Sequence, residues 1–156
     1  MFVALSHIGS YGLIWLVLAA LAVLLWRRPA IFMYVLAGEV LADATSYALR
    51  YAIGRDRPPV RFAEPHALVH VPANPSFPSG HAATSFACAT LLAWLTPLPR
   101  VPLFVLAALI AFSRVYDGVH YPLDVVGGAV LGLLVATALR LLAEALRRSE
   151  QGQQAG

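Results

Sequence analysis

Apolar residues gather in five runs along the chain, and short polar segments separate them. The runs cover residues 8–26, 30–49, 81–95, 101–112 and 122–146. A helix needs roughly 20 apolar residues to cross a bilayer, and the first, second and fifth runs reach about that length. The third and fourth are shorter, so their helices must extend into the flanking polar motifs, the fourth as far as Tyr116. The pattern predicts an all-α fold, a polytopic membrane bundle of about five transmembrane helices.

The composition supports a membrane protein with a single domain over residues 1–156. The chain is 60% hydrophobic and 12% charged, whereas soluble domains are roughly 25% charged. Its net charge of +3 comes from arginine alone, since lysine is absent. The arginines stand at the ends of apolar runs, which is typical of membrane boundaries and anion sites, so nucleic acid is not an expected partner. The polar residues 149–156 are expected to form a disordered tail.

The positive charges also predict an orientation in the cell (inner) membrane. If the five segments alternate, one face carries Arg27, Arg28, Arg100, Arg147 and Arg148. Positive charge in short loops favours the cytoplasm, which places the N-terminus outside and the C-terminus inside. The other face carries Arg50, Arg55, Arg57, Arg61 and Arg114, so the raw count is nearly equal. The predicted orientation therefore depends on a chemical role that explains the arginines of this second face.

Alternation brings three polar clusters to this second, extracytoplasmic face. They are "RYAIGRDRP" at residues 50–58, "PSGH" at residues 78–81 and "SRVYDGVHYPLD" at residues 113–124. The connection between the first two is long, and loops above about 12–15 residues in a compact domain are usually functional or disordered. The sequence therefore predicts a site at this face.

The residue types in these clusters suit an anionic phosphoryl group. The planar forks of Arg50, Arg57 and Arg114 match phosphate oxygens. Ser79 is the expected N-cap of the third helix, whose first amides form an anion cradle, and Gly80 lets a ligand approach the backbone. The same Pro-Ser-Gly sequence also fits a plain turn and helix cap.

Two histidines and an aspartate supply candidate reacting groups. His120 and Asp124 are four residues apart, so they share one face of a helical turn, and a carboxylate can fix the tautomer of an imidazole. His81 on the same membrane face is a candidate acid–base partner. Each residue alone also fits a structural role, because acids are favoured in a first helical turn and an interfacial histidine can bond a carbonyl.

Together the clusters resemble the three signature motifs of the type-2 phosphatidic acid phosphatase superfamily. Those motifs are usually K-x6-R-P, P-S-G-H and S-R-x5-H-x3-D, and they match here in the same order over residues 50–124. Arg50 stands where the family usually has lysine. Membrane members commonly have six spans, with three before the first motif, whereas only two predicted spans precede that motif here. The difference leaves open that the chain self-associates into a homo-oligomer.

The resemblance implies a role for each matched residue. His120 would be the nucleophile, Asp124 would orient it, and His81 would protonate the leaving oxygen and later activate water. The phosphoryl oxygens would be held by Arg50, Arg57, Ser79, the Gly80 amide and Arg114. The arginines would supply the charge stabilisation that a metal gives elsewhere, so neither a metal nor another cofactor is expected. Arg55 and Arg61 fall outside the motif spacing and are expected to matter much less.

The resulting hypothesis is a lipid phosphatase or diphosphatase acting on a lipid phosphate in the bilayer. Undecaprenyl diphosphate or another polyprenyl diphosphate is the first choice of substrate, and phosphatidic acid or phosphatidylglycerophosphate is the second. A rival of another class is an anion transporter or channel, but the pairing of His120 with Asp124 would then have no purpose. A third reading is a family relative that binds vanadate and oxidises halide.

Other polar residues have simpler interpretations. Glu39 and Asp43 form a stripe with Ser46 and Arg50, which is typical of a buried network that supports Arg50. Gly128 and Gly132 favour close helix packing within the bundle. A metal site from Glu64, His66 and His70 is disfavoured because their spacing is not a zinc motif.

Overall fold

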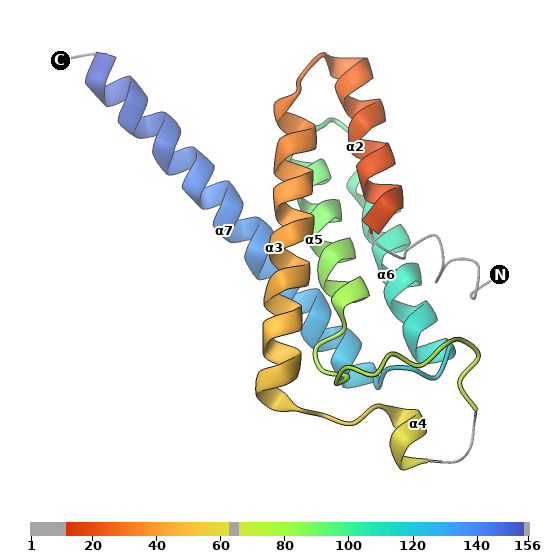
Figure 1. Cartoon of the computed structure of the whole chain (residues 1–156). Helices are drawn as coiled ribbons and strands as arrows, with labels where there is room; N and C mark the ends of the chain where they lie inside the picture. Colours follow the sequence, from red (N-terminus) through yellow and green to blue (C-terminus); the bar gives the residue numbers. More distant parts are fainter. Residues whose placement is uncertain (1–11, 63–65, 155–156) are drawn as a thin grey trace.

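The computed structural model describes residues 12–62 and 66–154, and every regular element in these two ranges is a helix. The helices are α2 (Leu13–Trp26), α3 (Ala30–Ile53), α4 (Pro58–Arg61), α5 (Gly80–Leu95), α6 (Arg100–Tyr116) and α7 (Pro122–Gln154) (Figure 1). The five apolar runs correspond to α2, α3, α5, α6 and α7. The all-α prediction is therefore confirmed for the described residues, and the first part of the first run lies outside them.

Local backbone signals fix several of these helix ends. Arg27 adopts a left-handed conformation (φ 54°) after α2, and α3 begins directly after Pro29. Gly54 (φ 67°) ends α3, and its amide donates to the Arg50 carbonyl, which is a common way to close a helix. Pro122 occupies the first position of α7, where its missing amide hydrogen has no cost.

The expected disordered tail is wrong for residues 149–154, because α7 continues through Gln154. The segment holds Glu150 and three glutamines, which have good helix propensity, and no proline, although Gly152 is a poor helix former. Earlier in the same helix, Arg140 Nε donates to Glu144 Oε1 at 2.8 Å, an i,i+4 pair that supports the helix.

The number of spans stays a prediction. Among the described helices, only Pro122–Gln151 is both long and apolar enough to cross a membrane by length and composition, and Leu13–Trp26 is apolar but shorter. The 16 residues of α5 and the 17 of α6 rise about 24–26 Å, against a hydrocarbon core of about 30 Å.

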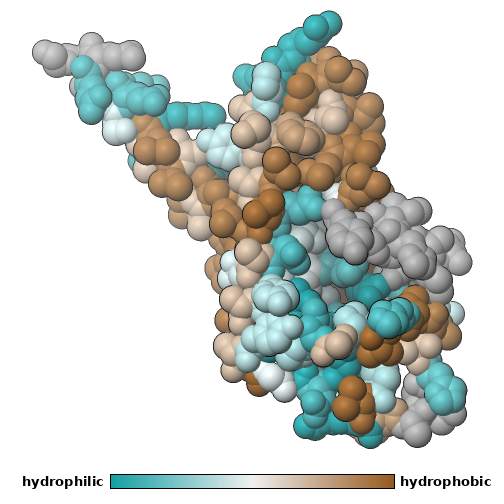
Figure 2. All heavy atoms as spheres, viewed as in Figure 1, coloured by the Kyte–Doolittle hydropathy of each residue, from teal (hydrophilic) through white to brown (hydrophobic). Residues whose placement is uncertain are grey.

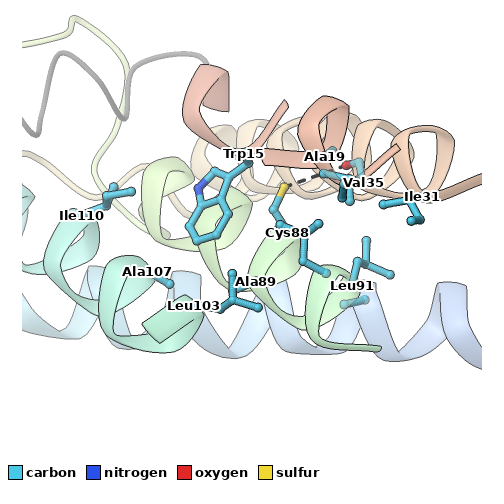
Figure 3. Packing of buried hydrophobic residues seen from close by; sticks show 13 residues of the cluster. Trp15, Ala19, Ile31, Val35, Cys88, Ala89, Leu91, Leu103, Ala107 and Ile110 are labelled. Atoms are coloured by element: carbon cyan, nitrogen blue, oxygen red, sulfur yellow. Dashed lines mark hydrogen bonds between the residues drawn. The ribbon is translucent and has the colours of Figure 1, made fainter. Parts of the chain in front are cut away.

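Helix α5 is the centre of the bundle and packs against α2, α3, α6 and α7. Its buried face is rich in small residues, while Trp15, Val35, Cys88 and Leu91 fill the core beside it (Figure 3). A side chain at Gly128 of α7 would clash with the backbone of Ser79 at the start of α5. The α7 glycines thus serve internal packing, as the sequence indicated.

The outside of the bundle is largely apolar. Exposed large hydrophobic residues occur on α2, α3, α6 and α7, and Figure 2 shows a broad hydrophobic area with hydrophilic patches near both ends of the molecule. Only 17% of the apolar window of α7 is buried within the chain, and this helix leans away from the others (Figure 1). Such an exterior suits lipid rather than water.

Candidate active site

The three polar clusters meet at one end of the bundle. The ends of α3 and α6, the starts of α5 and α7, and the short helix α4 all lie there, whereas the α2–α3 and α5–α6 connections lie at the opposite end (Figure 1). The convergence predicted from alternating helices is therefore confirmed.

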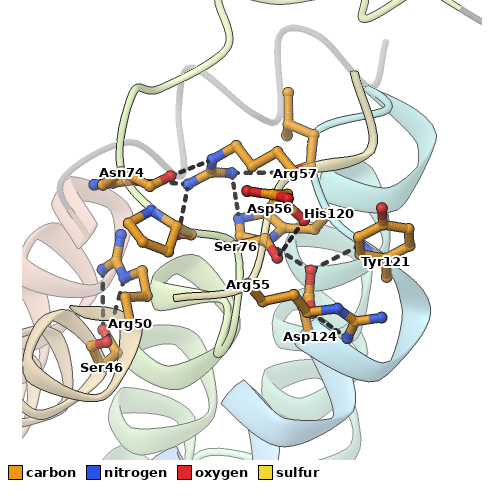
Figure 4. A network of polar contacts seen from close by, with 12 residues as sticks. Ser46, Arg50, Arg55, Asp56, Arg57, Asn74, Ser76, His120, Tyr121 and Asp124 are labelled. Atoms are coloured by element: carbon orange, nitrogen blue, oxygen red, sulfur yellow. Dashed lines mark hydrogen bonds and ion pairs between the residues drawn. The ribbon is translucent and has the colours of Figure 1, made fainter. Parts of the chain in front are cut away.

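His120 lies in the connection between α6 and α7 and is 4% exposed. Its Nε2 is 3.1 Å from Arg57 Nη1, and its Nδ1 is 3.4 Å from Asp124 Oδ2 (Figure 4). A guanidinium group can only donate, so Nε2 must accept and Nδ1 must carry the proton, which faces the carboxylate. The neighbours thus select the tautomer that leaves a lone pair on Nε2.

Asp124 in the first turn of α7 is fully buried. Its Oδ2 accepts a hydrogen bond from the Tyr121 amide at 2.9 Å. Its backbone carbonyl accepts from the Ser79 amide at 2.9 Å, which ties the start of α5 to α7. The Tyr121 amide therefore holds the carboxylate beside His120, and the Ser79 amide holds the backbone of the same residue.

Arg55 makes a contact that the motif spacing did not predict. Its Nη1 donates to Asp124 Oδ1 at 2.8 Å, and its Cζ lies 4.2 Å from the centre of the Tyr121 ring. The turn at Gly54 ends α3, and the following extended segment brings Arg55 to α7. Sequence reasoning missed this residue because the contact joins positions 69 apart. Its only local signal is a second arginine two positions before Arg57.

Arg57 is 3% exposed and is held by neutral oxygen atoms. Its Nε and Nη2 donate to the backbone and side-chain carbonyls of Asn74 at 2.9 and 2.7 Å, and its Nη1 donates to the Val119 carbonyl at 2.9 Å. Burial, together with the charges of Arg50 and Arg114, lowers the pKa of Arg57 to about 10. The guanidinium group still carries its charge at neutral pH.

Arg50 belongs to the last turn of α3. Its side chain lies beside the start of α5, as the sequence predicted, and is supported by other residues of α3. Its Nη2 donates to Ser46 Oγ at 3.1 Å and lies 3.7 Å from Asp43 Oδ1. A Cβ at Gly80 would come within 2.8 Å of Nη2, so glycine lets the guanidinium approach α5. Glu39 lies elsewhere, against Gly12 beside the first turn of α2.

Arg114 in the last turn of α6 is 6% exposed. Its Nη1 lies 3.6 Å from Oδ2 of Asp117, a fully buried residue. Asp117 was not among the predicted site residues, although the i,i+3 spacing from Arg114 is a signal that would have found it.

Two further predicted residues present polar atoms to the same region. Ser79 Oγ and His81 Nε2 are buried and make no hydrogen bond to any described residue. His81 is close enough to Arg114, His120, Arg50 and Arg57 to feel their charges. Buried polar atoms without partners are rare and costly in folded proteins, and a phosphoryl group bound among these cations would give both atoms a partner.

Burial lowers the pKa of His120 to about 4, although the neighbouring Asp124 acts in the opposite direction. The imidazole is therefore neutral at neutral pH and can act as a nucleophile. A neutral histidine whose Nε2 lone pair faces a guanidinium group, a carboxylate behind it and a second histidine form an arrangement suited to phosphoryl transfer.

Two remaining expectations concern residues away from this cluster. Arg61 is exposed and pairs with Asp56 at 3.4 Å, outside the contacts described above. In the ranges that the structure covers, no three His, Cys, Asp or Glu side chains are placed to hold a metal ion. His66 and His70 belong to those ranges, and Glu64 lies outside the described residues.

Comparisons with known proteins agree with this geometry. Residues 30–148 match the PAP2 superfamily. The decaprenylphosphoryl-5-phosphoribose phosphatase of Mycobacterium tuberculosis is 40% identical over 134 residues, which cover 84% of this chain and 72% of that protein. The undecaprenyl-diphosphatase of Sulfolobus acidocaldarius is 33% identical over 129 residues, 80% of this chain and 62% of that one.

Solved structures show the same likeness. The crystal structure of LpxE from Aquifex aeolicus gives a TM-score of 0.73 at 29% identity and covers 88% of this chain and 82% of that chain. A transmembrane PAP2-type phosphatidylglycerolphosphate phosphatase from Bacillus subtilis also gives 0.73, at 27% identity, with 92% and 75% covered. From its matched sequence, its helical bundle and its cluster of arginines and histidines, the chain belongs to the PAP2 superfamily.

Proposed function

We propose that the protein hydrolyses a phosphomonoester or diphosphate on a membrane lipid, without a metal and through a phosphohistidine. The chain is a lipid phosphatase by family, and the proposal concerns its mechanism and substrate. The observation that carries it is the setting of His120, whose Nε2 faces Arg57 at 3.1 Å while Nδ1 faces Asp124 at 3.4 Å. This setting gives a nucleophilic nitrogen an adjacent cation for the incoming phosphoryl group.

In the first step His120 Nε2 attacks phosphorus, and the bond from phosphorus to the leaving lipid oxygen breaks. The new P–N bond leaves a positive imidazolium, which Asp124 stabilises through Nδ1–H. His81, which takes up a proton as the anionic phosphoryl group binds, donates that proton to the leaving oxygen. The phosphoryl oxygens are held by Arg50, Arg57, Arg114, Ser79 and the Gly80 amide.

In the second step a water molecule attacks the phosphohistidine. His81, now neutral, accepts the proton of the attacking water, the P–N bond breaks, and inorganic phosphate leaves while His120 regains its lone pair. The arginines stabilise the charge on the equatorial oxygens in both transition states, as a metal does in other phosphoryl transfer enzymes.

A polyprenyl diphosphate such as undecaprenyl diphosphate is our first choice of substrate. Two relatives carry names with polyprenyl substrates, one a decaprenyl phosphoribose and one undecaprenyl diphosphate. The lipid-facing apolar exterior beside a cationic site suits an amphiphile with an anionic head. Phosphatidic acid or phosphatidylglycerophosphate is the second choice.

The substrate proposal is tested with the purified chain in detergent. Release of phosphate is measured from undecaprenyl diphosphate, phosphatidic acid and phosphatidylglycerophosphate at matched mole fractions, with and without EDTA. We expect the highest kcat/KM for the polyprenyl diphosphate and no loss with EDTA. A higher value for a glycerophospholipid would reverse the order of substrates, strong inhibition by EDTA would contradict the metal-free mechanism, and no release from any lipid would favour an anion transporter or channel.

The covalent step is tested with a phosphate-labelled substrate and a rapid acid or base quench. The wild-type protein should retain a label that is acid-labile and base-stable, as expected for phosphohistidine, and His120→Ala should retain none. His81→Ala should slow both formation and breakdown by about 10²–10⁴-fold, the usual contribution of general acid–base catalysis. Label on the His120→Ala variant would make His81 the better candidate nucleophile.

A further inference from the structure

The carboxylate of Asp124 divides its two oxygen atoms between different partners. Oδ2 faces His120 Nδ1 and accepts from the Tyr121 amide, whereas Oδ1 accepts from Arg55 Nη1 at 2.8 Å. Arg55 therefore lies on the side of the carboxylate away from His120 (Figure 4). It touches the group that faces the nucleophile and not the nucleophile itself.

This contact differs from an ordinary surface ion pair. Exposed pairs contribute little because water screens both charges, but the Asp124 side chain is fully buried while that of Arg55 is 34% exposed. Removing one partner of such a pair leaves a buried charge without compensation, which is far more costly. The contact is thus strong enough to control the state of the carboxylate.

Two further contacts hold Arg55 in place. Its guanidinium group lies over the Tyr121 ring with Cζ 4.2 Å from the ring centre, close enough for a cation–π attraction. Its backbone carbonyl accepts a hydrogen bond from the Ser76 amide at 2.8 Å. The backbone of Arg55 is therefore tied to the loop before α5, and its guanidinium group is held by Tyr121 and Asp124 at the start of α7.

We propose that Arg55 is a positioning residue that keeps Asp124 ionised and aimed at His120, and so keeps the His120 lone pair on Nε2. The inference rests on the proposed function of His120 as nucleophile. Without Arg55, Oδ1 would be buried without its charged partner, and the carboxylate could rotate or take up a proton. Either change weakens its hold on Nδ1–H, which lowers the fraction of His120 in the reactive tautomer.

A positioning role predicts a loss in kcat with little change in KM, because the interaction acts on the chemical step and not on substrate binding. Arg55→Gln should lower kcat about 10- to 100-fold, the range seen for partners that orient histidine ligands at metal sites. KM should change less than about threefold, and Arg55→Lys should restore part of the activity. The matched control Arg61→Gln removes an exposed arginine from the same connection and should change neither constant.

A double-mutant cycle tests whether Arg55 acts through Asp124. In an Asp124→Asn background, Arg55→Gln should cause little further loss, since the charge that it stabilises is already absent. Full additivity, or a rise in KM as the main effect, would overturn the proposal and make Arg55 a substrate-binding residue. Melting temperatures of all variants show whether a loss reflects unfolding.

A readout independent of turnover separates this inference from the proposed function. Nitrogen-15 spectra of histidine-labelled protein report the tautomer of His120, whose signal is identified by its absence in His120→Asn. The wild type should show Nδ1–H, and Arg55→Gln should show a mixture of tautomers. An unchanged tautomer in Arg55→Gln would contradict the inference even in an active enzyme. Failure of the wild type to hydrolyse any lipid phosphate would contradict the proposed function. The spectra would still show whether Arg55 controls the tautomer of His120.

Discussion

The buried arginines of the site differ in what balances their charge. Arg50 has Asp43 at 3.7 Å and Arg114 has Asp117 at 3.6 Å, so a carboxylate offsets part of each positive charge. Arg57 is instead held by the carbonyls of Asn74 and Val119, which orient the guanidinium group without neutralising it. No carboxylate of the described residues contacts Arg57, so its positive charge stays beside His120, where we expect it to stabilise the phosphoryl group.

This difference predicts that Arg57→Ala is more damaging than loss of any exposed arginine. A preorganised donor to a developing oxyanion is typically worth about 10²–10³ in kcat, and we expect a loss in that range for hydrolysis of the best lipid substrate. Arg61→Ala is the control and should stay within twofold of wild type. Equal losses for the two variants would show that the first motif has been assigned in the wrong register.

The buried His120 predicts that stability falls in mild acid. Its pKa is about 4 in the folded protein against roughly 6.5 when unfolded. As pH falls from 6.5 to 4 the unfolded chain takes up a proton that the folded chain does not, so folding becomes less favourable. The melting temperature in detergent should therefore drop between pH 7 and pH 4.5 more steeply for wild type than for His120→Asn. Parallel curves for the two proteins would contradict this account of burial.

At the scale of the helices, the site depends on how closely α7 approaches α5. Gly128 packs against the backbone of Ser79, and the Asp124 carbonyl one turn earlier accepts the hydrogen bond of the Ser79 amide. The same contact between helices therefore places His120 and Asp124 from one side and Ser79 and His81 from the other. Small residues at this contact set the distance across the site.

We accordingly expect Gly128→Ala to damage activity and stability together. Overpacking a tight contact typically costs about 1–3 kcal/mol, so the melting temperature should fall by several degrees, and kcat should fall at least tenfold as α7 moves outward. Ala138→Val adds more bulk on an exposed position of the same helix and should be neutral. Comparable effects from both substitutions would show that α7 is sensitive to added bulk in general. They would contradict a specific role for the contact between Gly128 and Ser79.

The helices and their common polar end could be predicted because both depend on local patterns. Apolar runs define α2, α3, α5, α6 and α7, and alternation of helix direction brings the motifs together. The partner of Asp124 could not be predicted, since Arg55 reaches it through the path of an irregular segment after Gly54. The helical end of α7 was missed because its polar composition and Gly152 resemble those of a tail, although its glutamate and glutamines favour a helix.

For the whole molecule, burial separates two sets of arginines that the sequence alone counts as nearly equal. At the site end, Arg50, Arg57 and Arg114 are 3–8% exposed, Arg55 is half-buried and paired with Asp124, and Arg61 is exposed but paired with Asp56. At the opposite end, all members of the other set are exposed: Arg27, Arg28, Arg100, Arg147 and Arg148. Positive charge that is free to interact with the cytoplasmic leaflet thus lies mainly at the end away from the site.

This distribution predicts that the site faces outward and the C-terminus faces the cytoplasm. A reporter enzyme that is active only outside the cytoplasm should stay silent when fused after Gly156, although the fusion protein is present in the membrane. The same reporter fused after Arg61, at the site end, should be active. Reporter activity after Gly156 with silence after Arg61 would show the opposite orientation. The exposed arginines would then not determine the topology, and the proposed hydrolysis would take place at the cytoplasmic surface.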